Sequence, residues 1–226
     1  MPTTTPHVHF PEDAPGDFET HVTFRCADAD IDALTAWGRE RGAGMTHIVL
    51  GRGRTPSQPM LTLSARTTLG AARTAAARLA TAAGARGFRA VRVKIEAAPW
   101  HDAVPSTDAA AAALGDTYYF EHHVKLLLDP GPDGAAPAGL VALATRHDAH
   151  LSHNARRRRD DGRLERFVTQ RCRGVGDGTA ARELASLTEA LTASGRHIVS
   201  IEREFVVFDD AESLDHGWIE EKGDRR

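Results

Sequence analysis

Two short segments of the chain carry carboxylate and imidazole side chains at the same spacing. Glu19 and His21 lie in Phe-Glu-Thr-His-Val-Thr-Phe, and Glu121 and His123 lie in Phe-Glu-His-His-Val-Lys-Leu, 102 residues further on. Neighbouring carboxylates and imidazoles can hold a divalent metal ion, or they can act as a general acid and base with shifted pKa values. The residue types therefore predict one of these two kinds of chemistry.

The two segments belong to a duplication. Gly87 matches Gly195 and Glu96 matches Glu204, both pairs at an offset of 108 residues. The offset changes only where a connecting loop could absorb an insertion, so the two halves are expected to share one fold. The predicted division is a disordered N-terminal arm at 1–16, repeat one at 17–97, a linker at 98–117, repeat two at 118–208 and a C-terminal tail at 209–226.

Each repeat has the pattern strand, helix, strand, strand, helix, strand. In repeat one, strands are expected at 18–24, 45–51, 60–66 and 88–96, and helices between Asp30 and Gly42 and at 69–83. This order packs most simply as a four-stranded antiparallel sheet with both helices on one face. The predicted fold class is therefore α+β, a tandem duplication of a ferredoxin-like βαββαβ unit with two such sheets.

Alternation along the strands decides which side chains share a face. If Val22 and Phe24 face the helices, Glu19 and His21 lie on the opposite face, close to Glu96 on the neighbouring fourth strand. Charged groups are costly to bury unless they are paired. The polar faces of the two sheets are therefore expected either to lie in water or to enclose a wet cleft between the repeats.

The leading hypothesis is that this charged, pseudo-symmetric cleft binds an anionic small molecule, for example a phosphorylated one, and in an enzymatic version hydrolyses it. The predicted roles are catalysis by His21 and His123, metal binding by Glu19, Glu96, Glu121 and Glu204, and substrate binding by Lys94, Lys125, Arg66, Arg171 and Arg173. The cofactor expected in the enzymatic version is a divalent metal ion, and otherwise none. The alternative is a non-catalytic binding or scaffold protein whose polar sheet faces are solvated.

One element resembles a known family. His21-Val22-Thr23 is similar to the His-x-Thr element of the two-histidine phosphoesterases, which cut phosphodiesters with one such element in each lobe. The second repeat has His123-Val124-Lys125 at the matching place, so lysine replaces the hydroxyl residue there. The resemblance implies a phosphoesterase-like hydrolase that uses either a metal ion or histidine acid and base catalysis.

Two basic hairpins are a second indication of an anionic ligand. Arg52 and Arg54 lie in the loop of the first repeat, and arginines fill 156–159 in the second. Arginine side chains bind phosphates and carboxylates with two parallel hydrogen bonds. The hairpins are predicted either to close over an anion or to protect the edges of the sheets.

Composition excludes several other functions. The 226 residues are 41% hydrophobic and 26% charged with a net charge of −3, which gives no overall attraction to nucleic acid or to anionic lipid. The aromatic pattern of RNA-recognition domains is absent, so RNA binding of that type is disfavoured. The sequence has neither an apolar run of membrane length nor an export signal, and its two cysteines lie at unrelated positions. The expected location is cytoplasmic, and no oligomeric state is predicted.

Overall fold

The structure is a computed structural model, and it describes residues 8–129, 137–157 and 159–218 of the chain. Repeat one contains β1 (Pro15–Arg25), α1 (Ile31–Arg39), β2 (Gly44–Leu50), β3 (Ser57–Thr68), α2 (Leu69–Gly84) and β4 (Arg89–Ala97). The linker holds one short helix, α3 (Asp108–Leu114). Repeat two contains β5 (Tyr119–Leu128), α4 (Ala138–Arg146), β6 (Ala149–Asn154), β7 (Leu164–Arg173), α5 (Asp177–Ala193) and β8 (His197–Asp209). Two short 3₁₀ turns, η1 (Asp28–Asp30) and η2 (Glu212–Asp215), complete the elements.

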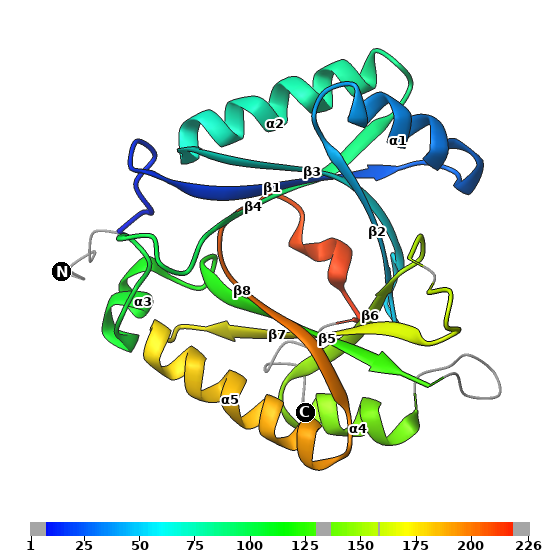
Figure 1. The fold of residues 1–226 in the computed structure, drawn as a ribbon. Helices are drawn as coiled ribbons and strands as arrows, with labels where there is room; N and C mark the ends of the chain where they lie inside the picture. The colour runs from blue at the N-terminus through cyan, green and yellow to red at the C-terminus, as the bar shows by residue number, and fades with distance from the viewer. Residues whose placement is uncertain (1–7, 130–136, 158, 219–226) are drawn as a thin grey trace.

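Each repeat is a ferredoxin-like unit, as the sequence predicts. The strands of repeat one lie in the order β4-β1-β3-β2, and those of repeat two lie in the order β8-β5-β7-β6, with every pairing antiparallel. The two helices of each repeat cover the outer side of its strands (Figure 1). The predicted fold class, a tandem duplication of this unit, is confirmed.

The two sheets also join to each other, which the sequence did not indicate. The edge strands pair as β2 with β6 and as β4 with β8, both antiparallel, and the eight strands close into a barrel. Closure removes the unpaired edges that each four-stranded sheet would leave. Because helices cover the outside, the polar faces of both repeats line one lumen.

The register of the β4–β8 pair brings the matching glutamates of the two repeats together. Ala97 pairs with Phe205 and Glu96 pairs with Val206, so Glu96 and Glu204 both lie next to the junction. The two polar faces therefore converge, as the cleft hypothesis requires.

Apolar side chains fill the space between the barrel and its helices. Repeat one buries a cluster around Phe24, Leu34 and Leu61, and repeat two buries one around Leu126, Leu140 and Leu187. A third cluster at the junction of the repeats includes Phe10, Phe18, Phe120 and Phe205.

Phe10 corrects part of the prediction for the N-terminal arm. Its side chain is 2% exposed, and its ring lies against Phe18, His101 and Phe205. The residues of the arm that follow position 7 therefore pack on the barrel, because an aromatic ring is available there to extend the junction cluster. Residues 1–7 lie outside the described residues.

The chain after β8 turns back into the lumen. Residues 210–218, here called the C-terminal strap, carry η2 across the inside of the barrel (Figure 1). Asp215 and Trp218 are each 4% exposed, and the indole Nε1 of Trp218 donates to the Leu151 carbonyl at 2.9 Å. These contacts anchor the end of the described chain against the barrel. Among the described residues, no helix combines the length and the apolar character needed to cross a membrane.

Candidate functional site

The lumen contains a cavity of about 250 Å³. All eight strands contribute residues to its wall, and so does the C-terminal strap through Asp215 and Trp218. The cavity is of a size that suits a small-molecule ligand. Most of the predicted site residues lie in its wall, because alternation along each strand directs every second side chain inward.

His21 is held in the wall by residues of its own repeat. Its Nδ1 lies 2.9 Å from the Thr62 hydroxyl, and its Nε2 lies 2.9 Å from Glu96 and 3.4 Å from Glu19. Burial acts to lower the pKa of His21, but the charge of Glu96 and the hydrogen bond to it raise the pKa overall. The imidazole is therefore biased toward its protonated form.

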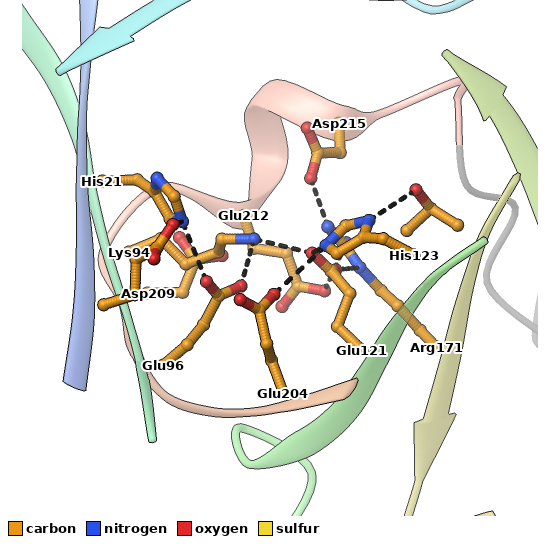
Figure 2. A network of polar contacts seen from close by, with 12 residues as sticks. His21, Lys94, Glu96, Glu121, His123, Arg171, Glu204, Asp209, Glu212 and Asp215 are labelled. Atoms are coloured by element: carbon orange, nitrogen blue, oxygen red, sulfur yellow. Dashed lines mark hydrogen bonds and ion pairs between the residues drawn. The ribbon is translucent and has the colours of Figure 1, made fainter. Parts of the chain in front are cut away.

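His123 has the matching environment in repeat two. Its Nδ1 lies 3.0 Å from the Thr169 hydroxyl, and its Nε2 lies 3.3 Å from both Glu121 and Glu204 (Figure 2). Burial acts to lower the pKa of His123, but the hydrogen bonds to Glu121 and Glu204 raise it to about 10. The side chain is thus an imidazolium at neutral pH.

Lys94 connects the two halves of the site. Its ammonium lies 2.6 Å from Glu96, which belongs to repeat one, and 2.6 Å from Glu121, which belongs to repeat two. Burial opposes ionisation of Glu96, yet Lys94 and then His21 hold its pKa below the usual range. Burial likewise opposes ionisation of Glu121, whose pKa is held down by Arg171 and Lys94. The network in Figure 2 is therefore a chain of compensated charges.

Two arginines on opposite repeats hold the C-terminal strap. Arg92 donates to Asp209 at 2.9 Å and to Asp215 at 3.1 Å, while Arg171 donates to Glu121 and, at 2.7 Å, to Asp215. Arg92 lies two residues before Lys94, so alternation along the strand puts both side chains on the polar face. This spacing is a sequence signal that Arg92 belongs to the site, although none of the predicted roles includes it. The two aspartates have no counterpart in repeat one, so the duplication gave no signal for them.

Two of the predicted substrate-binding residues, Arg66 and Arg173, lie outside the wall of this cavity. The side chain of Arg66 is 77% exposed and pairs with Asp17 at 3.4 Å, because Arg66 lies at the open end of its strand. Arg173 pairs with Glu212 and stacks on the ring of Tyr119 at 4.0 Å. Neither arginine lines the cavity. Lys94, Lys125 and Arg171 do line it.

Several arginines of the basic hairpins are bound at the surface, away from the cavity. Arg156 binds Asp32 at 2.6 Å, and Arg163 binds Asp161 in its own turn at 2.7 Å. Arg52 donates to the Trp218 carbonyl at 3.2 Å. These arginines are engaged by acidic or carbonyl groups at the surface, whereas Arg157 of the second hairpin borders the cavity.

Two of the predicted metal ligands, Glu96 and Glu121, lie close to His123. Glu96, Glu121 and His123 each offer a ligand atom, and these atoms all lie within 4.8 Å of one another. Two carboxylates and an imidazole are suitable donors for a divalent ion. However, the Lys94 ammonium already lies 2.6 Å from both carboxylates, where it supplies the positive charge that an ion would supply. Binding of an ion there requires Lys94 to move or to lose its proton.

Comparison with known proteins identifies no family. No family model matches the chain, and no curated protein matches it either. The chain is similar in structure to the small subunit of acetolactate synthase from Thermotoga maritima, with 9% identity and a TM-score of 0.30 over 85% of this chain and 95% of that one. It is similar to the regulatory subunit of aspartate kinase from Thermus thermophilus, with 12% identity and a TM-score of 0.31 over 80% and 99%. It is also similar to chlorite dismutase from Candidatus Nitrospira defluvii, with 13% identity and a TM-score of 0.28 over 85% and 91%.

Proposed function

We propose that the protein binds a small anionic molecule in the lumen and hydrolyses it, with His123 as the general acid and Glu204 as the general base. The observation that carries the proposal is the placement of His123. Its Nε2 lies 3.3 Å from Glu204 in the wall of the cavity, so a proton donor and a proton acceptor lie side by side there.

The raised pKa of His123 keeps its imidazole protonated, so that a proton is available to be donated. A group with a pKa of about 10 is protonated at neutral pH, and the Thr169 hydroxyl fixes the orientation of its ring. Glu121, the second carboxylate on Nε2, stabilises the imidazolium. A leaving oxygen that replaces one of these carboxylates at Nε2 can take the proton as its bond to the substrate breaks.

Glu204 has the properties of the matching base. Burial and the nearby charge of Glu96 raise the pKa of Glu204, which makes it a stronger proton acceptor than a glutamate in water. In the proposed step, Glu204 takes one proton from water while the water oxygen forms a bond to the phosphorus or carbonyl carbon of the ligand. The leaving oxygen receives the proton of His123, so charges and atoms balance.

Lys125 supports an anionic ligand. It lines the cavity with its ammonium 5.4 Å from the centre of the Phe167 ring, and the described part of the chain offers it no carboxylate within ion-pair distance. Arg157 lines the same cavity with a side chain that is 61% exposed, 3.9 Å from Glu165. Two weakly compensated cations in one wall favour a ligand with a phosphate or carboxylate group.

The experiment is a comparison of His123→Gln with the wild-type protein against a panel of aryl phosphates, phosphodiesters and carboxylic esters. Loss of a general acid is expected to lower kcat by about 10²- to 10⁴-fold with little change in KM. The wild-type rate is expected to fall as the pH rises through 10, because His123 then loses its proton. His9→Gln, at an exposed position outside the lumen, is the matched control. Equal activity of His123→Gln and wild type would remove His123 from the reaction.

A divalent metal ion at Glu96, Glu121 and His123 is the second version of the same function, and the donor set favours it. It is tested by elemental analysis of protein purified without a chelator and by assay with and without EDTA. A stoichiometric ion that EDTA removes together with activity favours this version. Activity that is unchanged in EDTA favours acid and base catalysis without a metal.

In the non-catalytic alternative, the protein binds the ligand but does not convert it. The polar faces of the sheets are not fully solvated in the lumen, since Glu96 and Glu121 are each 1% exposed. A ligand that raises the melting temperature without being turned over would favour a binding protein.

A further inference from the structure

The carboxylate of Asp215 lies at the centre of a set of donors that belongs to the barrel. Gln58 Nε2 lies 3.0 Å from it, Arg92 Nη1 lies 3.1 Å from it, and Arg171 Nη2 lies 2.7 Å from it. The three donors come from β3, β4 and β7, so both repeats contribute. Two guanidinium groups and an amide that converge on one carboxylate have the geometry of an oxyanion site.

The acceptor in this site does not belong to the duplicated unit. Asp215 lies on the C-terminal strap, which follows the last strand of repeat two and has no counterpart after repeat one. Gln58, Arg92, Arg171 and Asp215 all border the 250 Å³ cavity. The strap therefore places an anionic group in the wall of the chamber where the proposed ligand would bind.

The strap is held at its far end by contacts that could be released together. His216 accepts from the Arg54 amide at 3.0 Å, and Trp218 accepts from Arg52 and donates to Leu151. Gly53 lies so close to the strap that an added Cβ would be 3.1 Å from the Trp218 nitrogen, and its φ of +114° is in the region that favours glycine. The β2–β3 loop and the Trp218 side chain make these contacts at the far end of the strap. Its near end is held by barrel residues, because the Val93 amide donates to Asp210 at 2.7 Å and Arg173 pairs with Glu212.

Withdrawal of the strap would change the charge of the lumen. Arg92 would keep Asp209, Arg171 would keep Glu121 and Gln58 would keep the Thr55 carbonyl, but each of the three would lose the hydrogen bond that it gives to Asp215. Arg171 and Arg173 would also lose Glu212, which lies on the strap. Buried donors without an acceptor are costly, and an oxyanion that enters from solvent restores the missing bonds.

We propose that Gln58, Arg92 and Arg171 form an oxyanion subsite that the chain itself occupies with Asp215, and that a ligand with a carboxylate or phosphate group takes the subsite by displacing the C-terminal strap. This inference rests on the proposed function, because it names where the anionic group of the same ligand binds. The strap acts as an internal competitor, so the affinity of the intact protein for anions is lower than that of the open barrel.

The test uses Asp215→Ala in the full chain, with formate and inorganic phosphate as probes. Removal of the carboxylate is expected to lower the melting temperature, and either probe should restore it in a saturable manner. The half-saturating concentration should be at least about tenfold lower than for wild type, because no internal competitor remains. Sodium chloride at equal ionic strength and the surface variant Asp17→Ala are the controls. A stronger effect of formate assigns the subsite to carboxylates, and a stronger effect of phosphate assigns it to phosphates.

A folded Asp215→Ala protein that neither probe stabilises overturns the proposal. If this variant does not fold, Trp218→Ala tests the same idea, since it loosens the strap and leaves all three donors and Asp215 in place. Trp218→Ala is expected to bind phosphate at least about tenfold more tightly than wild type, and unchanged binding overturns the proposal.

The two proposals fail in different ways. Asp215→Ala combined with His123→Gln should keep the rescue by formate or phosphate, because His123 makes no contact with Asp215 in the described network. If formate or phosphate restores the melting temperature but no substrate is hydrolysed, the oxyanion subsite is supported and the proposed catalytic function is refuted. If hydrolysis depends on His123 but neither probe stabilises Asp215→Ala, the catalytic function is supported and the oxyanion subsite is refuted.

Discussion

At the scale of single residues, Lys94 has the largest structural consequence in the lumen. It is 13% exposed and compensates two carboxylates that are almost fully buried, one from each repeat. Removal of one partner from a buried ion pair leaves an uncompensated charge in a poorly solvated site. Lys94 therefore contributes to the stability of the junction between the repeats, together with His21 on Glu96 and Arg171 on Glu121.

Lys94→Met is expected to lower the free energy of unfolding by about 3–5 kcal/mol, the usual cost of breaking a buried ion pair. Denaturant unfolding of the variant and the wild type measures this difference. Lys125→Met, which removes a lysine without a carboxylate partner in the described part of the chain, should cost less than about 1 kcal/mol. Addition of Mg²⁺ or Mn²⁺ to Lys94→Met also shows whether an ion can take the place of the ammonium. A loss below about 1 kcal/mol would mean that Glu96 and Glu121 do not need Lys94.

At the scale of elements, β5 places two neighbouring histidines in opposite environments. His123 faces the lumen, and carboxylates raise its pKa to about 10. His122 faces the helices and is fully buried, and its Nδ1 donates a hydrogen bond to Gln170 Oε1 at 3.2 Å. Burial lowers the pKa of His122 from 6.5 to about 4. One strand therefore carries a histidine that stabilises the fold when charged and another that stabilises it when neutral.

The two histidines predict that the free energy of unfolding decreases both at acid pH and at alkaline pH. The contribution of His123 is fully present below pH 6.5 and is lost as the pH rises through 10, because its folded pKa is raised. The contribution of His122 is present above pH 6.5 and is lost as the pH falls toward 4, because its folded pKa is lowered. The acid limb attributable to His122 is about 3 kcal/mol.

His122→Gln tests the acid limb. Glutamine can keep the contact with Gln170 but does not titrate, so the variant should gain about 3 kcal/mol relative to wild type between pH 7 and pH 4. Unfolding in denaturant at a series of pH values gives this difference. A constant difference across that range would mean that another group causes the acid limb. His9→Gln is the control for a histidine outside the packed part of the strand.

At the scale of the whole molecule, closure of the barrel depends on pairing between equivalent strands. The β2–β6 and β4–β8 junctions join the corresponding strands of the two repeats. A single repeat would therefore carry edges that are complementary to those of a second copy of itself.

Repeat one expressed alone, as residues 8–97, is expected to form a dimer through its β2 and β4 edges. Light scattering coupled to size-exclusion chromatography measures its mass. A Pro substitution at Ile48 or Ile95, one on each junction strand, should prevent dimerisation because proline cannot donate in a strand ladder. A monomer that stays soluble at high concentration would show that these edges do not need a partner.

Much of this architecture could be predicted from the sequence, because it depends on local pattern. The alternation around Val22 and Phe24 and the matched positions of the two repeats are sufficient to identify the elements and the inward faces. The same alternation assigns His21, His123, Lys94 and the four glutamates to the inward faces, where the barrel holds them.

Closure of the barrel and entry of the C-terminal strap could not be predicted in this way. Pairing of β4 with β8 depends on tertiary geometry that one sequence does not record, and Asp215 has no repeated partner that would mark it. Arg66 lies outside the wall of the main cavity for a related reason. Its position in the alternation is that of an inward residue, but the strand has already passed the end of the lumen at that point.

Fusion of the two repeats into one polypeptide has a consequence for how the chamber can evolve. In a barrel made of two identical chains, every substitution appears twice, and the interior must keep an exact twofold axis. Here a change such as Thr23 in one half and Lys125 in the other alters one side only, and one C-terminal strap can enter without a second strap that clashes with it. Covalent linkage thus allows the two halves of the lumen to carry different side chains at matching positions.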